Sequence, residues 1–190
     1  MSPAFPAGNY SPRRNPPRVI LCHHTVTKSP EDTRRVLTRR GLSTHFEVGK
    51  DGTVYGYLDP ATISAWSAGR GNNQPTIAID FTHMTGEPFP QAQIDSGAKL
   101  VQSLGRIFAL PIVLAPAGQK MPMRQWLDAN VTLLRHNNVR ATICPDGLPM
   151  EDLANPYLTM PEIVIDTSQR GAGGGGIALG VLAVIAALAA

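Results

Sequence analysis

Residues 19–27, with the sequence VILCHHTVT, constrain the fold more than any other stretch of the chain. Four apolar residues of strand character are followed directly by His23, His24 and Thr25. A short apolar run bounded by polar residues is typical of a buried strand. Because a rigid strand fixes the side chains at its end, residues 18–22 predict a sheet that presents ligand-type groups for binding or catalysis.

Helix and strand patterns alternate along the next 130 residues. Ser29, Pro30 and the two acidic residues that follow are typical of a helix start, and this helix should end near Gly41. Further strands are predicted at 44–48, 53–58, 76–81, 112–114 and 131–136, and further helices at 91–109 and 150–156. The strands at 44–48 and 53–58 flank a turn and should pair as a hairpin. The alternation predicts the α/β class, with a sheet covered by helices.

The 190 residues suffice for one domain of about 150 residues with tails. Residues 1–17 are rich in proline and predict an irregular arm, followed by one domain over 18–168. A glycine-rich linker at 169–176 precedes an uncharged, apolar tail at 177–190. Fourteen residues are too few to span a bilayer, but 171–190 approach the required length. We expect this tail to be a helix that associates with a membrane or docks on a virion or other protein.

Charge and cysteine content narrow the functional classes. A net charge of +3 is too small to indicate a nucleic-acid partner and fits a protein that meets an anionic cell wall or lipid surface. Two cysteines do not make a disulfide framework, so reduced or metal-bound thiols are expected. The N-terminal residues lack the pattern of a secretory signal peptide. The protein is therefore expected in the cytoplasm of the producing cell, from which it reaches the wall, a membrane or a virion.

Three residues have the chemistry of a metal site. His23 and His136 each end an apolar strand, and Cys144 lies in a turn eight residues after His136. Two imidazoles and one thiolate would fill three positions of tetrahedral Zn²⁺ and leave the fourth open, as in catalytic zinc sites. The sequence contains no closely spaced ligand pair, so the alternative is two core histidines and an inert buried cysteine.

Several short motifs, in their order, resemble one enzyme family. They are LCHHTVTK at 21–28, LSTHF at 42–46, KDGTV at 50–54, AWSAG at 65–69 with the asparagines at 72 and 73, TIAID at 76–80, RH at 135–136 and CP at 144–145. Together they are similar to zinc-dependent N-acetylmuramoyl-L-alanine amidases, the superfamily of phage lysozyme-type amidases, bacterial amidase-2 enzymes and peptidoglycan recognition proteins. The resemblance covers residues 18 to about 150.

The resemblance implies a central mixed β-sheet flanked by helices, with a zinc groove at one edge. It implies His23, His136 and Cys144 as the zinc ligands, and His24 as a residue beside the ligands or on the surface. Since strand side chains alternate, Cys22 should point into the core. The implied reaction is hydrolysis of the amide between N-acetylmuramic acid and the L-alanine of the peptidoglycan stem peptide.

The chain departs from the relatives at the positions that assist the metal. Thr44 and Thr142 stand where phage-type enzymes have tyrosine and lysine, and Asp80 stands where amidase-2 enzymes have glutamate. We expect Asp80 to be the general base and Thr142 to donate a hydrogen bond to the oxyanion or water. The alternative for Asp80 is a carboxylate that holds a loop. The expected groove residues are Thr44, His45, Trp66, Arg70, Asn72 and Asn73, although Trp66 could equally pack beneath its loop.

Three functions fit the sequence. The first is a zinc amidase acting as a phage endolysin or virion-associated lysin. The second is a module that binds peptidoglycan without cutting it; recognition proteins of this fold lose activity when the cysteine ligand is replaced, whereas Cys144 is present here. The third is a membrane-associated assembly protein that acts through its C-terminal tail.

Overall fold

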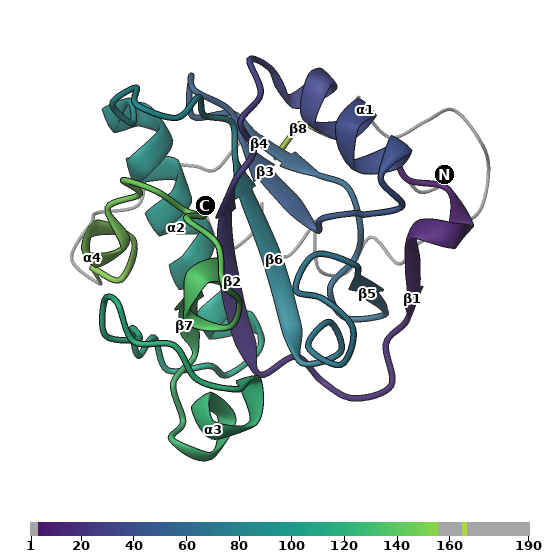
Figure 1. Cartoon of the computed structure of the whole chain (residues 1–190), viewed down its shortest axis with the longest axis vertical. Coiled ribbons are helices and arrows are strands. Elements are labelled where there is room, and N and C mark those ends of the chain that lie inside the picture. Colours follow the sequence, from purple (N-terminus) through teal and green to yellow (C-terminus); the bar gives the residue numbers. More distant parts are fainter. Residues whose placement is uncertain (1–3, 156–164, 167–190) are drawn as a thin grey trace.

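The computed structural model describes residues 4–155 and 165–166. Its main sheet has six strands in the order β7-β2-β6-β3-β4-β8 (Figure 1). The strands are β2 (Val19–His24), β3 (Phe46–Val48), β4 (Val54–Gly56), β6 (Thr76–Phe81), β7 (Leu133–Arg135) and β8 (Ile165–Asp166). Strands β7, β2, β6 and β3 are parallel, whereas β4 is antiparallel to β3. The mixed sheet of an α/β protein is therefore confirmed.

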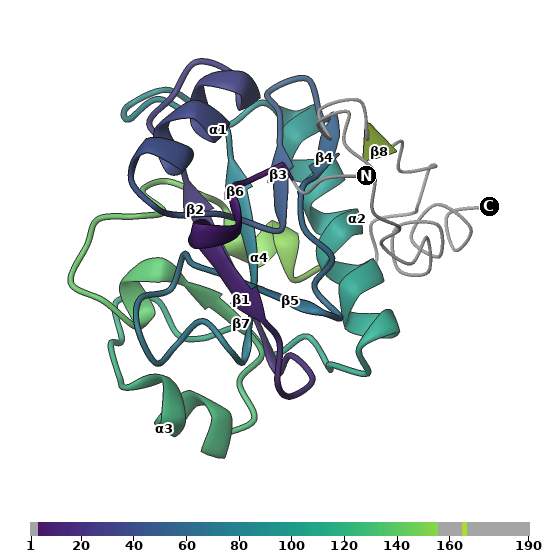
Figure 2. The ribbon, with the colours of Figure 1, turned by 90° about the vertical axis from the view of Figure 1, so that its right-hand side faces the viewer.

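Helices cover both faces of this sheet. Figure 2 shows α1 (Pro30–Arg39) and α2 (Gln91–Ile107) on opposite sides of the strands. The short α4 (Met150–Leu153) packs beside α2, and α3 (Met123–Asp128) covers the lower part of the α1 side. Apolar side chains of alternating strand residues fill the layer beneath α2, including Ile77, Ile79 and Phe81 of β6. Every residue of β2 and β6 is buried, as expected for central parallel strands covered on both faces.

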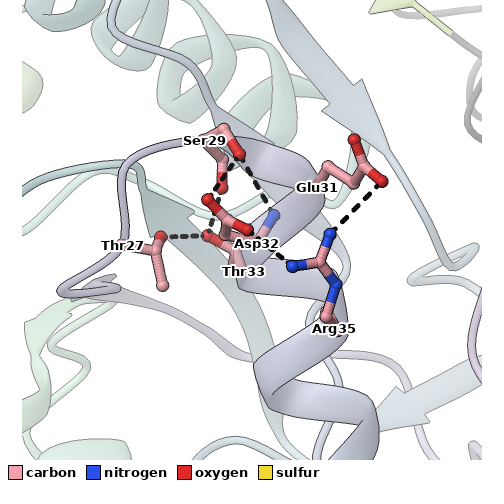
Figure 3. Close-up of polar contacts among 6 residues, drawn as sticks. All are labelled: Thr27, Ser29, Glu31, Asp32, Thr33 and Arg35. Carbon is pink, nitrogen blue, oxygen red and sulfur yellow. Dashed lines mark hydrogen bonds and ion pairs between the residues drawn. The ribbon is translucent and has the colours of Figure 1, made fainter.

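The start of α1 shows the capping contact that its sequence predicts. The Ser29 side chain accepts a hydrogen bond from the Asp32 backbone N–H at 3.2 Å, which satisfies a donor that has no partner within the helix. Asp32 and Glu31 both face Arg35 one turn later (Figure 3). The same view shows Thr27, in the loop after β2, joined to Thr33 on the inner face of the helix. This contact fixes the β2–α1 loop to the helix that follows it.

The N-terminal arm differs from its prediction as an irregular segment. A 3-10 helix, η1 (Ala7–Asn9), leads into β1 (Tyr10–Pro12), which pairs antiparallel with β5 (Ile63–Ala65). Phe5 is buried against Tyr57 with ring centroids 5.6 Å apart. The arm lacks apolar periodicity because it has no independent core; its few apolar residues instead cover the edge of the main domain.

Other element predictions are confirmed to within a few residues, with the following differences. Residues 112–114 form only an isolated bridge between Leu114 and Leu133, and α3, β5 and β8 were not expected. The segment predicted as a strand to His136 ends at Arg135, where the 3-10 helix η2 (His136–Asn138) begins. Residues 169–190 lie outside the described residues, so the expected linker and tail helix remain predictions. Within the described part, no helix is long and apolar enough to cross a bilayer.

Candidate metal centre

Parallel pairing brings the carboxyl-terminal ends of β2, β6 and β7 together at one end of the sheet. His23 stands opposite Asp80 in the register of β2 and β6, and β7, which ends just before His136, runs parallel to β2 on its other side. Ligand sites in α/β sheets form where the carboxyl ends of parallel strands meet. The predicted convergence of His23 and His136 at one end of the sheet is therefore observed.

Cys144 completes a compact group of donor atoms. The ligating atoms of His23, His136 and Cys144 all lie within 4.8 Å of one another. The imidazole rings of His23 and His136 have centroids 4.4 Å apart, and the Cys144 Sγ lies 3.9 Å from His23 Nδ1. No other group of three such side chains in the described part of the chain has this proximity. Residues separated by more than a hundred positions thus form one cluster of two nitrogens and one sulfur.

The protonation states of this cluster suit metal binding. Burial lowers the pKa of His23 well below its usual value, with further contributions from His136 and His24, and burial lowers the pKa of His136 to about 4. Both rings are therefore neutral near pH 7 and offer lone pairs. The Nε2 atoms of both rings are buried without a hydrogen-bond partner, which is costly unless something binds them. Burial raises the pKa of the Cys144 thiol to about 12, so metal binding would have to displace its proton.

Backbone contacts hold the cysteine in this position. The His24 backbone N–H donates to the Cys144 Sγ at 3.3 Å, and the Cys144 carbonyl accepts from the Asn137 N–H at 2.8 Å. His24 is only 7 % exposed and is not part of this cluster, so of the two expected positions it occupies the one beside the cluster. Cys22 is completely buried on the opposite face of β2, as predicted from strand alternation.

An ion pair between Arg135 and Glu151 holds the chain next to His136. The buried Arg135 donates to Glu151 of α4 at 2.7 Å and to the carbonyl of Ala115 at 3.1 Å. Because Arg135 directly precedes His136, these contacts fix the point at which the chain leaves β7. No sequence pattern indicates this pair, since its two residues are 16 positions apart and belong to different elements.

A cavity of about 300 Å³ opens on the cluster. Its wall contains all three cluster residues together with Asp80 and Thr142, so the structure brings the five predicted ligand and catalytic positions together. Thr142 is exposed, and its Oγ accepts a hydrogen bond from the Cys144 N–H at 3.2 Å. Its hydroxyl proton therefore remains available for donation to a group in the cavity.

Asp80 is 5 % exposed, and burial raises its pKa to about 7. A carboxyl group with this pKa can gain and lose a proton near neutral pH. Sequence reasoning missed its neighbour in the sheet, Glu47, which stands opposite Asp80 in the register of β3 and β6. Glu47 is fully buried and accepts hydrogen bonds from Tyr57 at 3.0 Å and Thr82 at 2.6 Å. Its signal in the sequence was a charged residue inside a strand of otherwise apolar residues.

Thr44 and His45 do not line this cavity, and their assignment to the groove stays a prediction. The Thr44 hydroxyl donates to the carbonyls of Phe46 and Ala78, and His45 is buried with Nδ1 accepting from the Ala78 N–H at 2.9 Å. His45 Nε2 lies 3.2 Å from Arg13 of the N-terminal arm. These side chains turn toward β6 and the arm, and they tie the edge of the sheet to the segment that covers it.

The other predicted groove residues lie farther from the cluster. Trp66, Arg70 and Asn73 line a second depression of about 640 Å³, which shares Leu42 with the cavity at the cluster. Asn72 faces a third depression on the far side of its loop, and its side chain donates to the Ala68 carbonyl. The structure therefore separates Asn72 from the other three and leaves them at the side of the site.

Comparison with known proteins agrees with this geometry. The sequence model of the amidase-2 family, described as N-acetylmuramoyl-L-alanine amidase, matches residues 13–147. No curated protein matches the chain. Among solved structures, the amidase LysC from Clostridium intestinale URNW is 24% identical, with 76% of this chain and 91% of that chain covered and a TM-score of 0.56.

Two further structures have the same fold. The Ph2119 endolysin of a Thermus scotoductus bacteriophage is 21% identical, with 78% and 90% coverage and a TM-score of 0.56. The Drosophila peptidoglycan recognition protein SA is 17% identical, with 74% and 79% coverage and a TM-score of 0.52. At these identities the structures support the fold, while the family match spans most of the chain. The chain belongs to the amidase-2 family of N-acetylmuramoyl-L-alanine amidases.

Proposed function

We propose that this protein is a zinc-dependent N-acetylmuramoyl-L-alanine amidase that removes stem peptides from peptidoglycan. The observation that carries the proposal is the cluster of His23, His136 and Cys144 in a cavity that also contains the buried carboxyl group of Asp80. A donor set of two neutral imidazoles and one thiolate fits Zn²⁺ and leaves room for a water or substrate. Bound zinc would supply Lewis acidity toward the scissile carbonyl and toward a water molecule.

Residues of the chain supply the remaining functions. Asp80 is the general base: its pKa of about 7 allows it to accept a proton from water and pass it to the departing amine. The exposed Thr142 hydroxyl stabilises the oxyanion or orients the water by donating a hydrogen bond. Both groups stand on the wall that carries the ligand cluster, although neither belongs to it.

The depression beside the metal cavity is proposed to bind the rest of the polymer. Trp66 is half-buried with its Nε1–H directed to Ser11, and Arg70 and Asn73 stand beside it with polar atoms for hydroxyl or carboxylate groups. A structure of similar fold, peptidoglycan recognition protein LE, is described in complex with a monomeric diaminopimelic acid-type peptidoglycan. A wall fragment of that size would extend beyond the cavity at the metal into this depression.

The test is digestion of purified peptidoglycan by the zinc-loaded protein, followed by mass analysis of the products. We expect free stem peptides that begin with L-alanine, and their release should stop with a chelator and in His136→Ala. His83→Asn is a matched control, because His83 stacks on Phe89 outside the ligand cluster and should leave the zinc content unchanged. Intact stem peptides after long incubation would refute the amidase, and retained wall binding without zinc would instead identify a binding module.

The biological role is a separate part of the proposal. The similarity to structures titled as endolysins supports a phage endolysin or a virion-associated lysin that is made in the cytoplasm and acts on the wall. Residues 171–190 are proposed to attach the enzyme to a membrane or a virion protein. Deleting them should leave hydrolysis of isolated peptidoglycan unchanged while abolishing cofractionation with membranes or particles. Loss of hydrolysis on deletion would show that the tail belongs to the catalytic domain.

A further inference from the structure

Two exposed apolar side chains, on separate loops, line the cavity at the cluster. Three large hydrophobic residues are exposed within the described part of the chain: Val26, Val113 and Ile143. Val26 and Ile143 both line the cavity at the cluster, whereas Val113 does not. Isolated apolar residues on a surface need no explanation, but two that share the wall of one reactive cavity are placed to contact a ligand.

The backbone at Val26 is held in an unfavourable conformation. Its φ is 53°, in the left-handed region that β-branched residues rarely adopt. The neighbouring residues impose this geometry, because Thr25 Oγ lies 2.6 Å from Thr27 Oγ. Thr27 Oγ in turn lies 2.5 Å from the hydroxyl of Thr33 in α1 (Figure 3). The Thr25 backbone N–H also donates to the Phe81 carbonyl. The loop thus directs the side chain of Val26, which is 50 % exposed, toward the cavity. Burial in the core would be more favourable for an apolar side chain, so the strained backbone indicates a functional position.

Ile143 occupies a comparable position on the cysteine loop. It is 67 % exposed and lies between Thr142 and Cys144. The Thr142 Oγ accepts from the Cys144 N–H, and the Cys144 carbonyl accepts from Asn137, so both neighbours of Ile143 are fixed. Its side chain is therefore presented by a fixed backbone on the other loop that frames the cluster.

We propose that Val26 and Ile143 determine substrate specificity by contacting the two methyl groups that flank the scissile amide. This inference rests on the proposed function. In an N-acetylmuramoyl-L-alanine bond, the lactyl carbon on the carbonyl side and the alanine carbon on the nitrogen side each carry one methyl group. The cavity offers one apolar side chain for each of these two methyl groups. A substrate with polar groups beside the amide would make no favourable apolar contact with either side chain.

The test uses three soluble muropeptides in competition. The first has the natural lactyl and L-alanine groups, the second has glycine in place of L-alanine, and the third has a glycolyl ether in place of lactyl. Competition gives the ratios of kcat/KM directly. We expect the wild-type enzyme to prefer the natural substrate over each analogue by roughly tenfold, the value of one methyl in an apolar contact.

Val26→Thr and Ile143→Thr keep the β-branched shape while adding a hydroxyl. Each variant should lose discrimination at one of the two methyl groups, with the ratio falling to within about threefold of unity. Ile143→Val should retain it, and Val113→Thr, which lies away from the cavity, is the matched control with wild-type ratios.

The outcomes separate this inference from the proposed function. If the wild-type enzyme cleaves all three substrates with equal kcat/KM, the apolar contacts are refuted while the amidase remains. Unchanged ratios in both threonine variants overturn the inference, and an unchanged ratio in one removes that residue from it. Failure to cleave any of the three substrates while the metal site is occupied refutes the amidase itself, and the inference with it.

Discussion

The buried carboxyl group of Glu47 makes a measurable prediction about stability. It lies beneath α1 with no exposed surface and accepts hydrogen bonds from Tyr57 and Thr82. Burial raises its pKa from the usual 4.5 to about 8, against the opposing effect of these hydroxyl groups. Glu47→Gln keeps the size and shape of the neutral acid and one acceptor oxygen, and it replaces the ionisable O–H by an amide that does not titrate. We expect this variant to be more stable than the wild-type protein at alkaline pH.

The direction of the pH dependence follows from the number of protons bound by Glu47 in the folded and unfolded states. Between pH 4.5 and about 8, the folded protein holds a proton on Glu47 that the unfolded chain has lost. The free energy of unfolding therefore falls as pH rises, by about 1.4 kcal/mol for each pH unit within this window. At pH 8 the accumulated cost is at most about 5 kcal/mol, a large part of a typical domain's stability. Below pH 4.5 the carboxyl group is neutral in both states, and the two proteins should converge.

Guanidinium denaturation of the zinc-free proteins at pH 5, 6, 7 and 8, followed by tryptophan fluorescence, measures this difference. Asp80, whose pKa burial raises to about 7, titrates in both proteins, and its charge also raises the pKa of Glu47. The difference between the two proteins therefore measures Glu47 together with its interaction with Asp80. Glu87→Gln is the control: Glu87 is exposed, and its hydrogen bond with Lys50 lowers its pKa, so its removal should not stabilise the protein at pH 8. Parallel stability curves for wild type and Glu47→Gln would refute the argument.

Three further predictions concern the ligands, the base and the core. Cys144→Ser should reduce zinc content well below one ion per chain by elemental analysis, because a hydroxyl is a poor substitute for thiolate. Asp80→Asn should retain zinc while lowering kcat by about 10²- to 10⁴-fold, and an unchanged kcat would remove Asp80 as the base. Gly97→Ala should lower the unfolding free energy by about 1–3 kcal/mol, because the added Cβ would lie 2.6 Å from the Phe81 ring. Thermal denaturation that shows no loss would indicate that α2 shifts to make room.

The sheet could be predicted from the sequence because its central strands are locally encoded. Both β2 and β6 are buried on two faces, so each contains a short apolar run, VILC at 19–22 and IAI at 77–79, that can be recognised without tertiary information. The helix at 30–39 was similarly encoded by its Ser-Pro-acid start. By contrast, β1 and β5 have no such pattern, since their pairing depends on the arm folding back across the domain edge.

The candidate metal cluster could be predicted from the sequence more fully than the residues that surround it. His23, His136 and Cys144 were identified by residue type, by strand ends and above all by family resemblance, and the structure brings them together. The positions of the Thr44 and His45 side chains were harder to predict, because both residues precede β3, which begins at Phe46, and so lie outside the regular alternation of a strand. In the structure both side chains bond to backbone groups of β6, and His45 also contacts Arg13 of the arm.

The residues around the ligands show how one sheet serves both stability and chemistry. His23, Asp80 and Glu47 stand in one row across β2, β6 and β3, on the face toward α1. Burial in this row keeps the imidazole neutral for a metal and raises the pKa of both carboxyl groups, which an exposed row would not do. The same burial destabilises the folded state at neutral and alkaline pH, because each carboxyl group must either keep its proton or carry an unsolvated charge. The row of His23, Asp80 and Glu47 on the central strands therefore stabilises the fold less than an apolar row would, whereas the apolar layer under α2 on the opposite face stabilises it.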